Sequence, residues 1–300
     1  MEYQSGANAI LVPDSHITTY SDLHNEVVRV SESLSGIEML PKSAISIVLP
    51  NSLEFMVMFL AVVRYGAIAA PLNSAYTAEE FKFYMEDAEA QAVIVPFEEH
   101  AAKDAARELG IQVIEVRASK EGVMDLCFDG APMTRLKDFS FPGEDDVALF
   151  LHTSGTTSRP KGVPLTHKNL ITSLDNIGST YHLTSDDVAM VVMPLFHVHG
   201  LIGVALSTLK TGGTIVVPPR FSASKFWLDQ SAYGATWYSA VPTIHQILLA
   251  RAEEDQAPAE SFRFIRSCSS ALAPSVFADL ESRFGAPVLE AYGMTEASHQ

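Results

Sequence analysis

Cysteine, tryptophan and basic residues are scarce in this 300-residue sequence. The two cysteines, Cys127 and Cys268, are far apart in the chain, which argues against a disulfide framework and favours a reducing compartment. Lysine and arginine number 20 against 36 aspartates and glutamates, so the formal net charge is −16. An acidic chain of this kind lacks a basic stripe to neutralise phosphates. We therefore expect no nucleic-acid partner and no docking to anionic membranes.

Long apolar runs are also missing. The longest run, residues 55–63, ends at Arg64 and is too short to span a bilayer, so we expect no membrane span. Glu2, Gln4 and Asn8 interrupt the apolar core that a secretory signal peptide needs. These features predict a soluble cytoplasmic protein, with a peroxisomal location left open for a full-length form. Apolar residues make up 47% of the chain, which is enough for a sizeable core.

Strand-like and helix-like segments alternate along the chain, a pattern typical of α/β proteins with mostly parallel sheets. We expect strands over residues 45–49, 67–70, 92–95, 112–116, 147–152, 188–193, 214–217, 235–239, 264–267 and 288–291. We expect helices over residues 52–65, 98–109, 201–209, 242–253 and 274–284. Thr77 and Glu80 have the spacing of a capping box at the start of another helix. Residues 118–141 show no clear period and are interpreted as loops, so the sequence predicts two β/α lobes, 1–141 and 142–300.

A loop rich in hydroxyls and glycine follows the strand expected at residues 147–152. Residues 153–162 read TSGTTSRPKG. Glycine lets backbone N–H groups approach an anion closely, hydroxyls add donors, and Lys161 adds a mobile positive charge. The loop is not a Walker A motif, because Pro160 stands where that pattern needs its second glycine. We interpret the segment as a phosphate-binding loop rather than a flexible surface loop.

The same ten residues resemble the phosphate loop of the acyl-adenylate-forming superfamily, which includes acyl-CoA synthetases, luciferases and peptide-synthetase adenylation domains. Residues 292–296, YGMTE, are similar to that superfamily's second signature, Y-G-x-T-E. Segments 194–197 (PLFH) and 269–274 (SSALAP) resemble two further family segments, in the same order. The resemblance covers essentially the whole chain. It implies the N-terminal part of an acyl-CoA synthetase-like fold.

This resemblance implies an enzyme that joins a carboxylate to ATP, releases pyrophosphate and passes the acyl group to CoA. The implied phosphate-binding residues are Thr153, Ser154, Gly155, Thr156, Thr157 and Lys161. Thr295 would contact the α-phosphate, and Glu296 would hold Mg²⁺, a hard cation that prefers oxygen ligands. The implied adenylate-binding residues are Ala271, Glu290, Ala291 and Tyr292, although Tyr292 could instead be an aromatic residue at the edge of the core. Lys161, Thr295 and Glu296 are the implied catalytic residues.

Five further segments narrow the resemblance to the oxalate–CoA ligase branch, also called peroxisomal CoA synthetase-like. They are FLHT at 150–153, SRP at 158–160, PLFHVHG at 194–200, ATWYSAVPTIHQ at 235–246 and RFIRSC at 263–268. In that branch the resemblance implies an acid pocket made by His197, Ser269 and His299. Two imidazoles and a hydroxyl suit the second carboxylate of a small acid, as hydrogen-bond donors or as cations. His197 and His199 could instead bind a metal or lie in the core, and Arg220 could meet a CoA phosphate or lie on the surface.

The sequence stops at Gln300, just after the second signature. The family continues with a ribose-binding aspartate, a hinge and a lid domain that carries a catalytic lysine, so we expect the C-terminal lid domain to be absent from this chain. Two classes of function remain open. The first is an ATP-dependent CoA ligase of a small carboxylic acid, with oxalate first and another small or aromatic acid second. The other is a nucleotide-binding module without turnover.

Overall fold

The computed structural model describes residues 5–37, 42–128, 130–133, 139–153, 160–253 and 262–300. Contacts between these residues divide the chain into two units. Unit 1 comprises Ala7–Ile17 and Thr172–Gln300, and unit 2 comprises Thr18–Ile171. The boundary expected at residues 141/142 lies inside unit 2. The physical reason is that Leu149, on the strand before the phosphate loop, pairs with Ala69 in the sheet of the first lobe.

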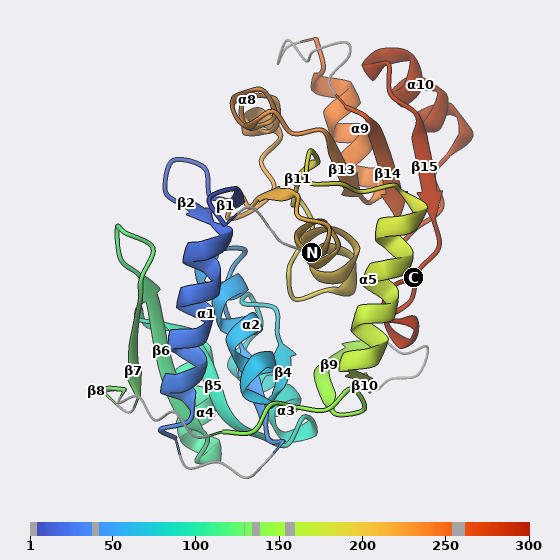
Figure 1. The fold of residues 1–300 in the computed structure, drawn as a ribbon. Helices are drawn as coiled ribbons and strands as arrows, with labels where there is room; N and C mark the ends of the chain where they lie inside the picture. Colours follow the sequence, from blue (N-terminus) through green and yellow to red (C-terminus); the bar gives the residue numbers. More distant parts are fainter. Residues whose placement is uncertain (1–4, 38–41, 129, 134–138, 154–159, 254–261) are drawn as a thin grey trace. The chain divides into compact units, whose positions relative to one another are not determined.

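Unit 2 is built on a sheet with the strand order β10-β9-β4-β3-β5-β6-β7-β8 (Figure 1). The strands from β9 to β6 are parallel to one another, whereas β10, β7 and β8 are added as antiparallel strands. The bounds are β3 Ala44–Ile47, β4 Ile68–Pro71, β5 Ala90–Pro96, β6 Gln112–Ala118, β7 Met124–Phe128, β8 Ala131–Pro132, β9 Val147–Thr153 and β10 Lys161–Thr166. The strand β7 lies within residues 118–141, so the interpretation of that whole stretch as loops is wrong.

Helices cover both faces of this sheet. They are α1 Tyr20–Leu34, α2 Leu53–Tyr65, α3 Ala78–Asp87 and α4 Ala101–Leu109. The chain passes from β3 to β4 through α2, then returns across β3 to β5 through α3. Since crossovers between parallel strands are right-handed, this reversal puts α2 on one face and both α3 and α4 on the other. Figure 1 shows α1 beside α2, and a buried apolar cluster that includes Phe81, Met85 and Val93 lies under α3 and α4.

Unit 1 has the strand order β15-β14-β13-β11-β12-β1-β2, and the pairs from β15 to β1 are parallel. The bounds are β1 Asn8–Leu11, β2 Ile17–Thr19, β11 Val188–Met190, β12 Thr214–Val216, β13 Trp237–Ala240, β14 Phe264–Cys268 and β15 Val288–Ala291. The chain runs from β11 outward to β12 and then crosses back to β13. The strand order therefore reverses at β11, and open α/β sheets bind ligands beside the carboxyl ends of strands at such a point.

The helices of unit 1 are α5 His167–Thr180, which begins in unit 2, α6 Val198–Gly200, the π-helix η1 Leu201–Leu206, α7 Ser207–Lys210, α8 Ala223–Tyr233, α9 Pro242–Arg251, α10 Pro274–Phe284 and the short 3₁₀ helix η2 Thr295–Ala297. By the same right-handed rule, α8, α9 and α10 cover one face of the sheet, where Phe226, Leu248 and Leu280 join the core. The segment α6–η1–α7 connects β11 to β12 on the other face.

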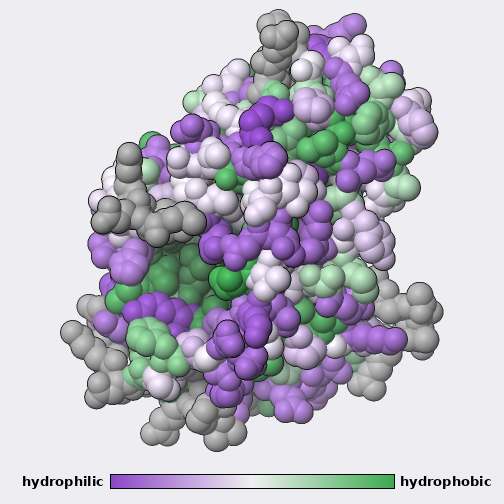
Figure 2. All heavy atoms as spheres, turned by 45° about the vertical axis from the view of Figure 1, so that its right-hand side comes forward, coloured by the Kyte–Doolittle hydropathy of each residue, from purple (hydrophilic) through white to green (hydrophobic). Residues whose placement is uncertain are grey.

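The surface is polar over much of its area. On the face drawn in Figure 2, hydrophilic residues are interspersed with apolar ones. A few large apolar side chains are nevertheless exposed, among them Ile17, Leu228 and Tyr292. Within the described ranges, no helix combines the length and apolar character that crossing a bilayer requires.

Candidate active site

The PLFHVHG segment forms the turn that follows β11 and the start of the next helix. His197 is the N-cap residue, and its Nδ1 accepts a hydrogen bond of 3.2 Å from the backbone N–H of His199. The helix then continues as a π-helix over Leu201–Leu206. A π-helix is rare and is frequently found at functional sites. His197 is exposed, whereas His199 is buried below the helix start.

His199 joins two serines that come from different strands. Its Nε2 lies 2.7 Å from Oγ of Ser239 on β13, and its Nδ1 lies 3.0 Å from Oγ of Ser269, which follows β14. Ser269 is exposed and has φ +71°, a left-handed conformation that is uncommon for serine. The structure therefore brings Ser269 next to His199. His197 instead caps the helix.

Arg266, in the middle of β14, is completely buried in the same region. Its backbone pairs with Ser239 on β13, so both side chains point to the face that carries η1. The guanidinium donates to Tyr181 Oη at 3.0 Å, to Ser239 Oγ and Gly203 O at 3.4 Å, and to His299 Nε2 and Gln300 Oε1 at 2.7 Å. None of these five acceptors is a carboxylate, so within the described residues the positive charge of Arg266 is hydrogen-bonded and has no ion-pair partner among them.

His299 is placed by a closed loop that contains the YGMTE motif. Met294 and His299 exchange two backbone hydrogen bonds, with η2 between them. His299 has φ +86°, and Ser298 before it has φ +53°. Ser173 of α5 fixes the end of the loop, because its Oγ lies 2.6 Å from Ser298 O. As a result the His299 ring is buried and stacks on His199, with 5.6 Å between ring centroids and 17° between planes.

Two glycines make room for His299. A Cβ atom on Gly203 of η1 would lie 2.5 Å from His299 Nε2, and one on Gly293 would lie 2.3 Å from the His299 carbonyl oxygen. Real Cβ atoms do not approach other atoms so closely, and the Gly293 clash is with backbone that cannot rotate away. Glycine is therefore required at residue 293 for the loop to close on its own histidine.

Both buried histidines are held as neutral rings. Burial lowers the pKa of His299 to about 3, and the nearby charge of Arg266 acts in the same direction. Burial also lowers the pKa of His199 far below its usual 6.5, again with the help of Arg266. Near pH 7 the two imidazoles are therefore hydrogen-bonding groups rather than cations. Of the two imidazoles that the sequence assigned to the acid pocket, His299 therefore belongs with the hydrogen-bonding groups.

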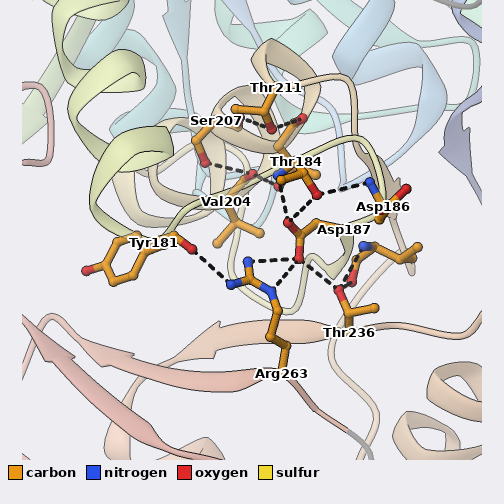
Figure 3. Close-up of polar contacts among 11 residues, drawn as sticks. Tyr181, Thr184, Asp186, Asp187, Val204, Ser207, Thr211, Thr236 and Arg263 are labelled. Atoms are coloured by element: carbon orange, nitrogen blue, oxygen red, sulfur yellow. Dashed lines mark hydrogen bonds and ion pairs between the residues drawn. The ribbon is translucent and has the colours of Figure 1, made fainter.

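A second network behind the cluster holds Tyr181 in position (Figure 3). Arg263, at the start of β14, donates to the backbone oxygen of Tyr181 at 3.0 Å and to the buried carboxylate of Asp187 at 2.9 Å. Asp187 also accepts from Thr184 N at 2.8 Å and from Thr236 Oγ1 at 3.2 Å. Tyr181 is thus fixed through its backbone, while its hydroxyl accepts from Arg266.

The adenylate motif lies at the carboxyl end of β15. Tyr292 is 85% exposed, so it is not a core aromatic residue. Thr295 is buried at the start of η2, and Glu296 is exposed. Glu290, on β15, accepts a hydrogen bond of 3.1 Å from Leu272 N, which ties the 269–273 loop to that strand. The remaining two residues implied for adenylate binding are at the same edge of the sheet, with Ala271 exposed and Ala291 half-buried.

The phosphate loop connects β9 to β10 in unit 2. Thr153 and Lys161 are paired across this hairpin, so they lie opposite each other at its base, and Lys161 is exposed. The other implied phosphate-binding residues, Ser154, Gly155, Thr156 and Thr157, lie outside the described residues. His152, next to the loop, has Nε2 3.0 Å from a carboxylate oxygen of Asp87.

A pocket of about 350 Å³ opens in unit 1 beside the carboxyl ends of β1, β11 and β12. Its lining includes the apolar residues Met190, Val192 and Phe226 and the charged residues Arg220, Lys225 and Asp229. Lys225 is paired with Asp14, with 3.2 Å between Nζ and Oδ2. Arg220 is exposed.

Sequence reasoning missed three members of the buried cluster: His199, Ser239 and Arg266. His199 differs from His197 by two positions in an H-x-H pair, and the sequence does not say which imidazole turns inward. The signal for Arg266 was a charged residue inside the short apolar strand that RFIRSC forms, where only a hydrogen-bonded guanidinium could be buried.

Comparisons with known proteins show which family the chain is similar to. A family model described as AMP-binding enzyme matches residues 2–300. An oxalate–CoA ligase of Arabidopsis thaliana is 47% identical over 299 residues, covering 97% of this chain and 58% of that protein. An oxalate–CoA ligase of Saccharomyces cerevisiae is 41% identical over 324 residues, covering 97% of this chain and 59% of that protein.

Solved structures are similar in fold. The o-succinylbenzoate CoA synthetase of Bacillus subtilis, in complex with ATP and magnesium ion, matches with a TM-score of 0.84 and 25% identity. The match covers 99% of this chain and 59% of that one. The chain therefore spans less than two thirds of the proteins that it resembles.

Proposed function

The chain belongs to the AMP-binding enzyme family, and from this premise we propose that it is the acid- and nucleotide-binding part of an ATP-dependent acid–CoA ligase for oxalate. The observation that carries the choice of acid is the buried set of Arg266, His199 and His299 beside Ser269. The identity to two oxalate–CoA ligases supports the same choice.

Oxalate is small, doubly charged and strongly hydrated. Binding it requires that charge-assisted hydrogen bonds replace its hydration. The exposed Ser269 hydroxyl supplies a donor, the neutral imidazoles lie beside and behind it, and the buried Arg266 adds a positive charge to the same cluster. A fatty acyl chain would leave these polar groups without partners. We expect discrimination against such acids of order 10⁴, which is far more than one methylene group can give.

ATP would bind with adenine against the exposed ring of Tyr292 and the α-phosphate near Thr295. Thr153, Lys161 and the rest of the phosphate loop would bind the β- and γ-phosphates. The exposed carboxylate of Glu296 fits Mg²⁺, because this ion takes one or two protein carboxylates and completes its shell with phosphate oxygens and water. When bound, Mg²⁺ would neutralise phosphate charge.

In the proposed reaction an oxalate oxygen attacks the α-phosphorus of ATP, the bond to pyrophosphate breaks, and oxalyl-AMP forms. The CoA thiol then gives up its proton and attacks the activated acyl carbon, and the bond to AMP breaks. Both reactants of the first step are anions. The protein therefore has to offset their repulsion, which Arg266 does on the acid side and Lys161 on the side of the leaving pyrophosphate.

CoA would use the pocket at the carboxyl ends of β1, β11 and β12. Its apolar lining residues suit the pantetheine arm, and Arg220 suits a phosphate. Lys225 is less available, because it is paired with Asp14.

The proposal is tested by acid-dependent ATP–pyrophosphate exchange and CoA-thioester formation. The chain is assayed alone and joined to the remaining part of the Arabidopsis relative, with oxalate, malonate, acetate, coumarate and a medium-chain fatty acid. We expect the highest kcat/KM with oxalate. A fatty or aromatic acid as the best substrate would overturn the oxalate assignment and leave the ligase assignment standing. No acid-dependent exchange with any of the five would overturn both.

A further inference from the structure

The hydrogen bonds around His199 form a chain that runs from Arg266 to the exposed Ser269. Arg266 Nη1 lies 3.4 Å from Ser239 Oγ, Ser239 Oγ lies 2.7 Å from His199 Nε2, and His199 Nδ1 lies 3.0 Å from Ser269 Oγ. A guanidinium can only donate, whereas a serine hydroxyl can both accept and donate, and a neutral imidazole has one nitrogen of each kind. The direction of the whole chain is therefore set at its buried end.

Ser239 accepts from Arg266, and the one acceptor in reach of its own proton, among the contacts described, is His199 Nε2. His199 must then carry its proton on Nδ1 and donate it to Ser269 Oγ. Because Ser269 Oγ accepts this hydrogen bond, its own hydroxyl proton is not used within the chain of hydrogen bonds. Ser269 is exposed at the carboxyl edge of the sheet. His299 is oriented in the same way, because its Nε2 accepts from Arg266 and its proton must be on Nδ1.

We infer that Ser239 is a positioning residue that makes His199 a donor and thereby frees the Ser269 hydroxyl to donate to the distal carboxylate of the acid. This inference rests on the proposed function for the identity of the acid. In the opposite direction, His199 would accept from Ser269, and Ser269 would present only lone pairs to an anion, which repel it. Ser239 itself is fully buried, so it acts on the acid only through His199.

Substitutions at Ser239 separate this role from a packing role. Ser239→Val removes the hydroxyl, and Ser239→Thr keeps it. Valine and threonine have nearly the same shape, and both are β-branched, which suits a strand. We expect Ser239→Val to raise the KM for oxalate about 10- to 100-fold, as for loss of a hydrogen bond to a charged group, with the KM for ATP unchanged. Ser239→Thr should restore most of the loss. Ser267→Ala is the matched control, because this buried serine is on the other face of β14, and its hydroxyl has no partner in the part of the chain described.

A second readout needs no activity. With ¹⁵N-labelled histidine, NMR of the 300-residue chain should find His199 protonated at Nδ1, and Ser239→Ala should shift it toward the Nε2 form. His199 protonated at Nε2 in the unsubstituted chain would overturn the inference. So would a rise in the KM for oxalate that is equal in Ser239→Val and Ser239→Thr. Failure of the unsubstituted enzyme to use oxalate would instead refute the acid assignment, while the NMR result would still decide the direction of the hydrogen-bond chain.

Discussion

The buried neutral state of His299 should make unit 1 sensitive to mild acid. In the unfolded chain a histidine has its ordinary pKa of 6.5, whereas burial and Arg266 lower the native pKa of His299 to about 3. Between these two values the unfolded state binds the proton and the native state does not. The contribution of this ring to stability is therefore complete above pH 6.5, and it falls as the pH drops toward 3.

The size of the effect follows from the two pKa values. Between pH 7 and pH 5, His299 alone should lower the free energy of unfolding by about 2 kcal/mol, at 1.36 kcal/mol per pH unit below 6.5. The result changes little with the native pKa as long as this pKa stays well below 5. Two other buried histidines add to the total fall, so the test must isolate His299. Burial lowers the pKa of His245 to about 4 and also lowers the pKa of His199.

His299→Gln isolates it. The amide oxygen of glutamine can accept the hydrogen bond from Arg266 and does not titrate. We expect the fall in unfolding free energy between pH 7 and pH 5 to be about 2 kcal/mol smaller in this variant than in the unsubstituted chain. His24→Gln is the control for replacing a histidine by glutamine, because His24 is exposed on α1.

Tryptophan fluorescence during urea unfolding measures this quantity in the right part of the molecule. The chain has two tryptophans, Trp227 and Trp237, and both are buried in unit 1 with His299. An equal fall in His299→Gln and in the unsubstituted chain would refute the argument, since His299 would then not be a buried neutral ring.

Two other expectations concern single cations. Lys161→Ala should slow acid-dependent pyrophosphate exchange about 10- to 100-fold, because one charge-assisted contact is lost. Thermal unfolding should stay unchanged, since the side chain is exposed. An unaltered exchange rate would exclude Lys161 from the mechanism. Arg263→Ala should lower the unfolding free energy by about 3 kcal/mol in urea titration, because Asp187 stays buried without its cation. The exposed pair of Arg107 and Asp104 is the control, and Arg107→Ala should cost less than about 1 kcal/mol. Equal losses in the two variants would contradict the role given to Asp187.

Elements with strong local signals could be predicted closely. The capping box of Thr77 and Glu80 is confirmed at the start of α3, and α10 has the expected bounds, with Pro274 in its first turn and Gly285 in a left-handed conformation after its end. These signals act within a few residues, so neighbouring sequence is enough to read them. β7 was not predicted, because it is a short strand whose pairing with β6 depends on partners about ten residues away.

The candidate site could be predicted only in part, because some of its residues are placed by local motifs and others by contacts between distant segments. The motifs located Ser269 and His299, which the structure places around the buried cluster. They could not identify His199 or Arg266, since the roles of these residues depend on the register of β13 against β14 and on the approach of η1. The sequence likewise offered no way to decide whether the imidazoles are charged, because burial and the distance to Arg266 decide that.

The bond between Arg266 and His299 also affects how this site could change during evolution. Under the proposed function, room for a longer acid beside Ser269 would come from loss of the His299 ring. Loss of that ring alone would leave a buried guanidinium N–H of Arg266 without its acceptor, beside Gly203. Loss of Arg266 alone would leave His299, whose backbone is left-handed, without the hydrogen bond that holds its ring. Each single step is costly, whereas the double change removes both partners at once. The pair is therefore expected to be inherited or replaced together, which makes a change of substrate accessible mainly through coupled substitutions.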